Sequence, residues 1–179
     1  MAILVDQARW PWRGDYWCHL VSDSDLEELH EFARLLGCRR VGFQGDHYDI
    51  NVETRVRAVD IGAIELDSRE LVRRMKTAGL RLRPSQFTKW GLVTHGDPGN
   101  ALPAKFMPSE ITPYVEDADG FFVLDRERHD GSMAAATVVY GCGDMSLPAE
   151  DPGGGFFVRT TPAGGWSIEV ISPAPTPKE

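Results

Sequence analysis

The stretch YWCHLVSDSDLEELHEFARLLG (residues 16–37) encodes a strand and a helix in immediate succession. Within residues 16–21, successive side chains suit opposite faces of a sheet, which is the period of a β-strand. Ser24 begins a capping box, and Gly37 ends the apolar helical stripe that follows. The sequence therefore predicts a strand over 16–21 and a helix over roughly 25–36.

The same alternation continues to residue 83. Further strands are predicted at 3–5, 41–43 and 64–66, and further helices begin at Asn51 and Asp67 and end at Gly62 and Gly79. Val52, Val56 and Val59 are expected to face inward from the first of these helices, and Leu71, Val72 and Met75 form the apolar stripe of the second. Strands that alternate with short helices indicate an α/β domain. For residues 1–83 we predict an α/β N-terminal domain, a short mixed sheet with about three helices.

The pattern changes after residue 83. Residues 84–118 read as a Pro-rich connection, because prolines and turn-forming dipeptides interrupt every periodic segment. Residues 119–172 contain two similar units, each with a Gly-Phe-Phe-Val strand, a glycine turn and a second strand. We predict a small antiparallel β-hairpin module there, followed by a disordered tail at 173–179.

Composition and charge restrict the partners. The chain of 179 residues has a net charge of −8, and residues 85–179 carry 6 basic and 13 acidic side chains. Because an acidic module repels phosphates, nucleic acid is disfavoured, and a small molecule or a host protein is the expected partner. The apolar start of the chain predicts a strand rather than a signal peptide, and no run is long enough to span a membrane.

The cysteines bear on location. The chain has three, Cys18, Cys38 and Cys142, without the paired spacing of a zinc site or a disulfide framework. An odd number without such spacing favours a reducing compartment, so we predict a cytoplasmic protein.

Polar residues suited to ligand binding gather in the N-terminal half, most densely in the loop Gly45-Asp46-His47-Tyr48-Asp49. Tryptophans beside arginines could hold a nucleobase and a phosphate, and carboxylates with imidazoles could hold a metal. The candidate ligand-binding residues are Asp6, Trp10, Arg13, Trp17, His19, Gln44, Asp46, His47 and Asp49. Four of these are also candidate metal ligands: Asp6, His19, His47 and Asp49.

Each candidate also has a structural interpretation. Asp6 could cap a loop amide or pair with Arg13, and Asp49 could cap the helix that begins near Asn51. His30 lies on the inward stripe of its helix, which favours a hydrogen-bonded core histidine. The basic run over 69–83 is typical of a solvated helix face.

The N-terminal half resembles the family known as domain of unknown function 4031, found in bacteria and phages. The match extends over about residues 3–80, and we see no resemblance in residues 85–179. The residues that carry it are Val5-Asp6, Trp10, Arg13-Gly14, Trp17 to Asp23, Glu28-Leu29-His30, Phe32-Ala33, Gly37, Phe43 to Asp49, Arg55, Ala58, Gly62-Ala63 and Arg69-Glu70.

The resemblance implies an intracellular α/β domain, often encoded by phages, without an established activity. Gln7 departs from the pattern, because a second acidic residue is expected beside Asp6, and this weakens a two-carboxylate metal site. The family therefore supplies no mechanism.

Two functions fit the sequence. The first is an intracellular, phage-encoded accessory protein that binds a small phosphorylated ligand or a host protein and needs no cofactor. The absence of a phosphate loop, dinucleotide fingerprint, nucleophile elbow or His-Glu-x-x-His motif favours it. The alternative is a small metal-dependent hydrolase of a phosphoester or nucleotide, with a divalent metal held by the Asp/His cluster. The alternative requires at least three ligands that converge on one cavity.

Overall fold

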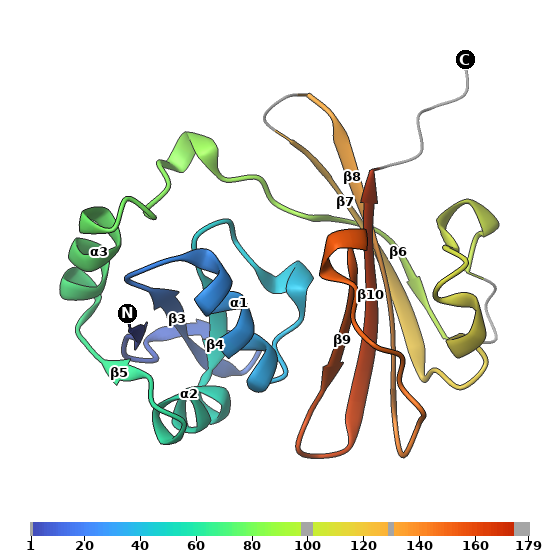
Figure 1. The fold of residues 1–179 in the computed structure, drawn as a ribbon, viewed down its shortest axis with the longest axis horizontal. Coiled ribbons are helices and arrows are strands. Elements are labelled where there is room, and N and C mark those ends of the chain that lie inside the picture. Colours follow the sequence, from blue (N-terminus) through green and yellow to red (C-terminus); the bar gives the residue numbers. More distant parts are fainter. Residues whose placement is uncertain (1, 98–101, 129–130, 174–179) are drawn as a thin grey trace. The chain divides into compact units, whose positions relative to one another are not determined.

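The computed structural model describes residues 2–97, 102–128 and 131–173. It divides into two compact units, Met1–Phe87 and Thr88–Glu179, which we call the N-terminal and C-terminal units and describe separately (Figure 1). Among the described residues, no helix combines the length and the apolar character needed to cross a membrane.

The N-terminal unit contains a mixed sheet of five strands. They are β1 (Ile3–Val5), β2 (Trp10–Trp12), β3 (Asp15–Ser22), β4 (Tyr48–Asn51) and β5 (Ile64–Glu65). The order is β2-β3-β1-β5, and β4 pairs with β3. β1 runs antiparallel to β3 and parallel to β5, so the predicted mixed sheet is confirmed.

Three helices accompany the sheet: α1 (Leu26–Leu35), α2 (Val52–Asp60) and α3 (Ser68–Thr77). Asn51 caps α2 by accepting a hydrogen bond from Thr54 N, and Asp67 caps α3, both as predicted. The cap of α1 is Asp25, one residue beyond Ser24.

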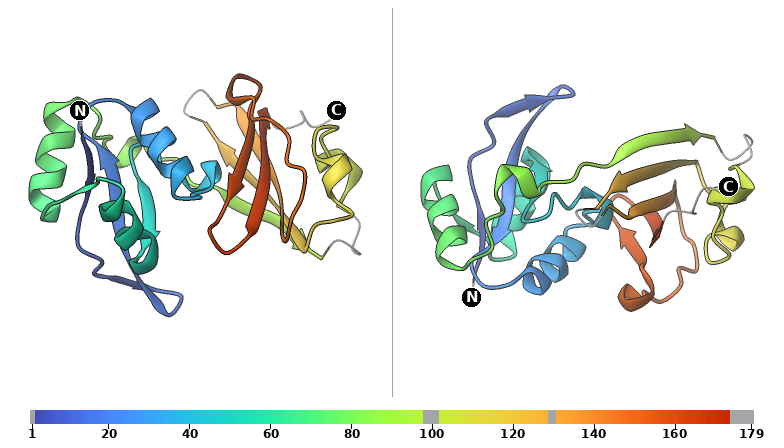
Figure 2. Two further views of the ribbon diagram at one scale, coloured as in Figure 1. Left: turned by 60° about the horizontal axis from the view of Figure 1, so that its bottom comes forward. Right: turned by 90° about the horizontal axis from the view of Figure 1, so that it is seen from above.

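Both faces of the sheet are covered by helices (Figure 2). Ile3 and Val5 of β1 belong to the hydrophobic cluster that includes buried residues of α1 and α2. Leu4, which points the opposite way, packs with Val21, Leu71 and Met75 in a second cluster. β1 and β3 therefore lie between α3 on one face and α1 and α2 on the other.

The predicted inward face of α2 is wrong in part. Val52 and Val56 were expected to be buried, but both are exposed. Ala58 is the buried residue of this helix, and Val59, partly buried, packs against the same hydrophobic cluster.

The third strand lies later in the chain than the sequence suggests. Residues 41–43 do not form a strand; a short 3₁₀ helix, η1 (Arg40–Gly42), occupies this position. The strand is β4, in which Tyr48 and Ile50 are buried and Asp49 points outward. Its polar residues resemble a loop, but they alternate with apolar ones at the period of a half-buried strand.

The C-terminal unit contains the predicted antiparallel sheet. Its five strands are β6 (Gly91–Gly96), β7 (Gly120–Glu127), β8 (Met133–Cys142), β9 (Phe156–Thr160) and β10 (Gly165–Pro173), in the order β6-β7-β8-β10-β9. Phe121, Phe156 and Trp166 belong to its core. The remaining short 3₁₀ helices are η2 (Pro84–Gln86), η3 (Ala104–Phe106), η4 (Thr112–Tyr114) and η5 (Pro152–Gly154).

Part of the segment expected as a connection is built into this unit. β6 is an edge strand, and Leu102 and Ile111 are core residues. Asp130 of the predicted first turn lies outside the described residues. So do residues 174–179 of the predicted tail, whereas Pro173 ends β10.

Candidate metal centre

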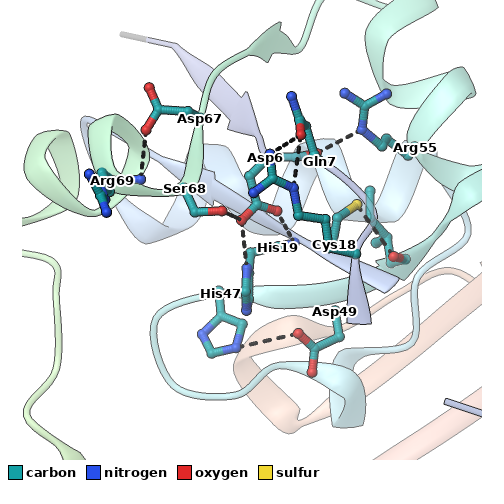
Figure 3. A network of polar contacts seen from close by, with 12 residues as sticks. Asp6, Gln7, Cys18, His19, His47, Asp49, Arg55, Asp67, Ser68 and Arg69 are labelled. Atoms are coloured by element: carbon teal, nitrogen blue, oxygen red, sulfur yellow. Dashed lines mark hydrogen bonds and ion pairs between the residues drawn. The ribbon is translucent and has the colours of Figure 1, made fainter. Parts of the chain in front are cut away.

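Two histidines and a carboxylate converge on one side of the N-terminal sheet. His19 of β3 and Asp49 of β4 are register partners in the antiparallel pair, so their side chains share a face. His47 directly precedes β4. One potential ligand atom from each of the three residues lies within 4.8 Å of the other two (Figure 3). Such a group can hold one metal ion.

His19 is oriented by the buried carboxylate of Asp6. Oδ2 of Asp6 lies 2.9 Å from Nδ1 of His19 and accepts a hydrogen bond of 2.7 Å from the Ser68 hydroxyl. Oδ1 accepts a 2.8 Å hydrogen bond from the backbone N–H of His19. Because Nδ1 faces a carboxylate, Nε2 is the nitrogen that His19 has available for a ligand.

His47 is held in the same way by Asp46, which is also buried. Nδ1 of His47 lies 2.5 Å from Oδ1 of Asp46. Oδ2 of Asp46 accepts hydrogen bonds from the backbone N–H of Leu82 at 2.9 Å and from Arg81 at 3.0 Å. Nε2 of His47 lies 3.5 Å from Oδ1 of Asp49. Histidines that bind metals commonly have a carboxylate on the second ring nitrogen, which fixes the tautomer.

The same contacts shift the pKa values of Asp6, His19 and Asp46. Burial acts to raise the pKa of Asp6, but hydrogen bonds from His19 and Ser68 outweigh it, and the pKa lies below its ordinary value. The hydrogen bond to Asp6 raises the pKa of His19 despite partial burial. For Asp46, burial is again opposed by hydrogen bonds from His47 and Leu82, and the pKa is lowered. Both orienting carboxylates are therefore ionised at neutral pH.

A cavity of about 200 Å³ lies beside the centre. His19 and His47 line it, whereas Asp49 is outside its lining. The other lining residues are Asp6, Trp10, Val21, Ser68, Leu71, Val72, Met75 and Arg81. The centre is thus adjacent to a space that a small molecule could enter.

Residues 3–78 match the family model described as "Protein of unknown function (DUF4031)". The match covers the N-terminal part of the chain and agrees with the resemblance seen in the sequence; the C-terminal half has no family match. Neither a search of the curated proteins nor a search of the solved structures found a match. The DUF4031 region contains His19, His47 and Asp49, and it ends before Arg81.

The candidate residues of the DUF4031 region fall into four groups. His19, His47 and Asp49 converge, and Asp6 and Asp46 lie behind the two histidines. Trp10 lines the cavity, with its ring centroid 6.3 Å from that of His19. The remaining three are not among the residues that line the cavity: Arg13, Trp17 and Gln44.

Those three residues have other contacts. Arg13 sits at the β2–β3 turn with a positive φ of 51° and lies over the ring of Trp12. The indole N–H of Trp17 donates to the carbonyl of Trp12. Gln44 donates its backbone N–H to the carbonyl of His47, which closes the loop before β4.

The structure also shows which contacts Asp6, Asp49 and His30 make in place of, or in agreement with, the structural roles considered for them. Asp6 bonds to His19 and Ser68 rather than to Arg13, and Asn51 rather than Asp49 caps α2. His30 Nδ1 lies 3.0 Å from the Tyr48 hydroxyl, and its ring packs edge-on against Phe43. His30 is therefore a half-buried, hydrogen-bonded histidine that stands apart from the convergent group.

Sequence reasoning missed Ser68 and Arg81. Ser68 looks like an ordinary first residue of a capped helix, and Arg81 looks like the exit of a basic helix face. Their partners Asp6 and Asp46 are 62 and 35 residues away, so no local spacing reveals either contact. The apolar stripe of α3 was recognised, but only as core.

Proposed function

We propose that the DUF4031 region binds one divalent metal ion through Nε2 of His19, Nε2 of His47 and the carboxylate of Asp49. The observation that carries the proposal is the convergence of these ligand atoms, with both imidazoles held from behind by buried carboxylates. Two histidines and one carboxylate form a ligand set that suits zinc or iron(II). Three protein ligands leave a coordination position for water, which is the requirement for catalysis.

We propose further that the metal-bound water hydrolyses a small phosphorylated compound. A divalent ion lowers the pKa of its bound water to about 7, which supplies hydroxide near neutral pH. Arg81 lines the same cavity, and a guanidinium beside a metal ion favours an anionic substrate. Asp6 and Asp46 hold the two histidines in the tautomer that leaves Nε2 free for the metal.

A binding function without chemistry has separate support. The β2–β3 hairpin exposes Trp10, Trp12 and Tyr16, and exposed aromatic side chains are typical anchors at protein interfaces. An accessory role toward a host protein would use this hairpin. The phage origin and the cytoplasmic location stay predictions of the sequence.

Isothermal titration of the metal-free full-length protein with zinc and manganese tests the metal centre. We expect binding of one ion per chain. The variants His19→Ala, His47→Ala and Asp49→Asn should each lower the affinity by at least about tenfold, and Asp6→Asn by about 10- to 100-fold. Circular dichroism melts of each variant report whether the fold is retained.

Two histidine variants serve as matched controls. His95→Ala removes an exposed histidine of β6 and should leave both metal affinity and stability unchanged. His30→Ala removes a hydrogen bond to the Tyr48 hydroxyl and should cost about 0.5–1.5 kcal/mol of stability without changing metal affinity. Equal metal affinities for the wild type and His47→Ala would refute the centre.

A further inference from the structure

The cavity beside the proposed metal centre has a polar side and an apolar side. The polar side consists of the two histidines, Arg81, Asp6 and Ser68. The apolar side is formed by Val21 of β3 and by three residues of α3, Leu71, Val72 and Met75. Leu71 and Met75 are almost fully buried, so this wall is fixed by the packing of α3 on the sheet. A ligand in the cavity must match both sides.

Arg81 supplies a positive charge and N–H donors beyond the one that bonds to Asp46. Its Nη1 donates to Asp46, and its guanidinium lies 5.6 Å from the ring centroid of Phe87. Within the described ranges, Nε and Nη2 of Arg81 have no hydrogen-bond partner, and about a third of the side chain is exposed (33%). A guanidinium held by one edge can offer the other edge to two oxygens of a phosphate.

The apolar side has little to offer a hydroxyl group. Two other polar side chains of the lining already bond to each other, because the Ser68 hydroxyl donates to Asp6, and Asp6 also pairs with Nδ1 of His19. A sugar or polyol in this space would leave hydroxyls without partners, which costs about 1–3 kcal/mol for each group. A hydrocarbon group would instead gain from burial.

The cavity also limits the size of the ligand. Its volume of about 200 Å³ lies below the roughly 300–1,000 Å³ of pockets that hold drug-sized ligands. It suits one compact group, such as a single ring or a short branched chain.

We infer that the substrate is a phosphate monoester of a compact apolar alcohol. This inference rests on the proposed function. The hydrocarbon group occupies the apolar side, and the phosphate lies between the metal centre and Arg81. The metal-bound water adds its oxygen to phosphorus, and the bond from phosphorus to the alcohol oxygen breaks. The alcohol leaves with a proton from that water, and inorganic phosphate is the second product, so neither oxidant nor reductant is required.

Binding of non-hydrolysable phosphonates to the metal-loaded full-length protein tests the inference. Benzylphosphonate carries a compact ring, 2,3-dihydroxypropylphosphonate carries a polyol, and inorganic phosphate carries neither. We expect benzylphosphonate to bind at least about tenfold more tightly than the other two, because only its ring gains from burial. Benzyl phosphate should be hydrolysed with a lower KM than glycerol phosphate.

Two variants separate the contribution of the apolar side from that of Arg81. Val72→Phe places a ring on the apolar side at a half-buried position and should abolish the advantage of benzylphosphonate while phosphate and the metal still bind. Arg81→Gln should weaken all three anions by at least about tenfold and leave the metal bound.

The outcomes distinguish the two proposals. If the wild-type protein binds neither zinc nor manganese, the proposed metal centre is refuted. Metal binding with equal affinity for the three anions would overturn the substrate class and leave the centre in place. An unchanged benzyl preference in Val72→Phe would also overturn it, because the ring would then bind elsewhere.

Discussion

At the scale of single residues, the three histidines of the N-terminal unit differ in what lies against their Nδ1 atoms. His19 and His47 face buried carboxylates, whereas His30 faces a tyrosine hydroxyl. A carboxylate makes the opposite nitrogen a better metal ligand, and a hydroxyl only satisfies a buried ring. The chemistry available to each histidine is therefore set by one neighbouring side chain.

The Asp6–His19 pair should make the stability of the metal-free protein depend on pH. The pKa of Asp6 is lowered from 3.8, so its contribution is present above pH 3.8 and is lost as pH falls through the lower folded value. The pKa of His19 is raised from 6.5, so its contribution is complete below pH 6.5 and is lost as pH rises through the higher folded value. Both contributions are complete only between these limits.

We therefore expect the gap in Tm between the wild type and His19→Ala to be widest between pH 3.8 and 6.5 and to narrow at higher pH. A charged hydrogen bond of this kind is worth about 1.5–3 kcal/mol. Melts in the presence of a chelator, from pH 3 to pH 9, measure the gap, and His95→Ala serves as the unaffected control. A gap that stays constant from pH 5 to pH 9 would contradict the pairing.

The residues of the candidate site stand out in the sequence, but the contacts between their side chains do not. Asp6, His19, His47 and Asp49 stand out because polar groups at strand ends and in loops often bind ligands. Their pairing depends on which atoms face each other across β1, β3 and β4, and spacing along the chain does not contain that information. Asp6 is therefore assigned here to orienting His19 rather than to the metal.

At the scale of elements, the position of β4 decides the geometry of the site. Had the strand been at residues 41–43, Asp49 would lie in a loop with no fixed relation to His19. The turn before β4 contains Gly45, which has a φ of +100°, and a Cβ at this position would lie 2.8 Å from Cδ1 of the Leu82 side chain. This turn sets the positions of Asp46 and His47.

Replacement of Gly45 by alanine should therefore damage both stability and metal binding. The backbone conformation disfavours an L side chain by about 1–3 kcal/mol, and the tip of the Leu82 side chain must also shift. Zinc affinity should fall by about tenfold or more, as for other changes behind a metal ligand. Titration and thermal melts of the same preparation measure the two effects.

Gly62→Ala is the matched control. Gly62 also has a positive φ, of 114°, but nothing lies within 4 Å of the position that its Cβ would occupy. It should lose a similar amount of stability and keep full zinc affinity. Equal zinc affinities for Gly45→Ala and Gly62→Ala would show that the turn at Gly45 does not position the metal ligands.

Helices were predicted better than strands. Each helix has local sequence signals, namely a capping residue such as Asn51 or Asp67 at its start and a glycine at its end. A strand is defined by its partner, and Tyr48-Asp49-Ile50-Asn51 becomes recognisable as one only beside residues 17–20 of β3.

At the scale of the whole molecule, the N-terminal unit should fold and bind metal alone. Its two hydrophobic clusters are made of residues between Ala2 and Met75. Residues 1–87 expressed separately should therefore melt in one cooperative transition and bind zinc as tightly as the full chain does. A broad, non-cooperative melt would mean that residues beyond 87 complete this core.

The large-scale division of the chain was visible in the sequence as the change from helix–strand alternation to hairpins. The sequence did not show that part of residues 84–118 packs into the C-terminal unit. Leu102 and Ile111 look like isolated apolar residues among prolines, and only the sheet of the C-terminal unit gives them a surface to cover.

The two carboxylates behind the histidines also bear on the order of events during synthesis. Asp6, His19, Asp46, His47 and Asp49 leave the ribosome first. Ser68, Arg81 and Leu82, which complete the hydrogen bonding of Asp6 and Asp46, emerge later. A nascent chain that stops short of these residues holds its imidazoles loosely. Under the proposed function, tight metal binding therefore has to wait until residues 68–82 have been translated.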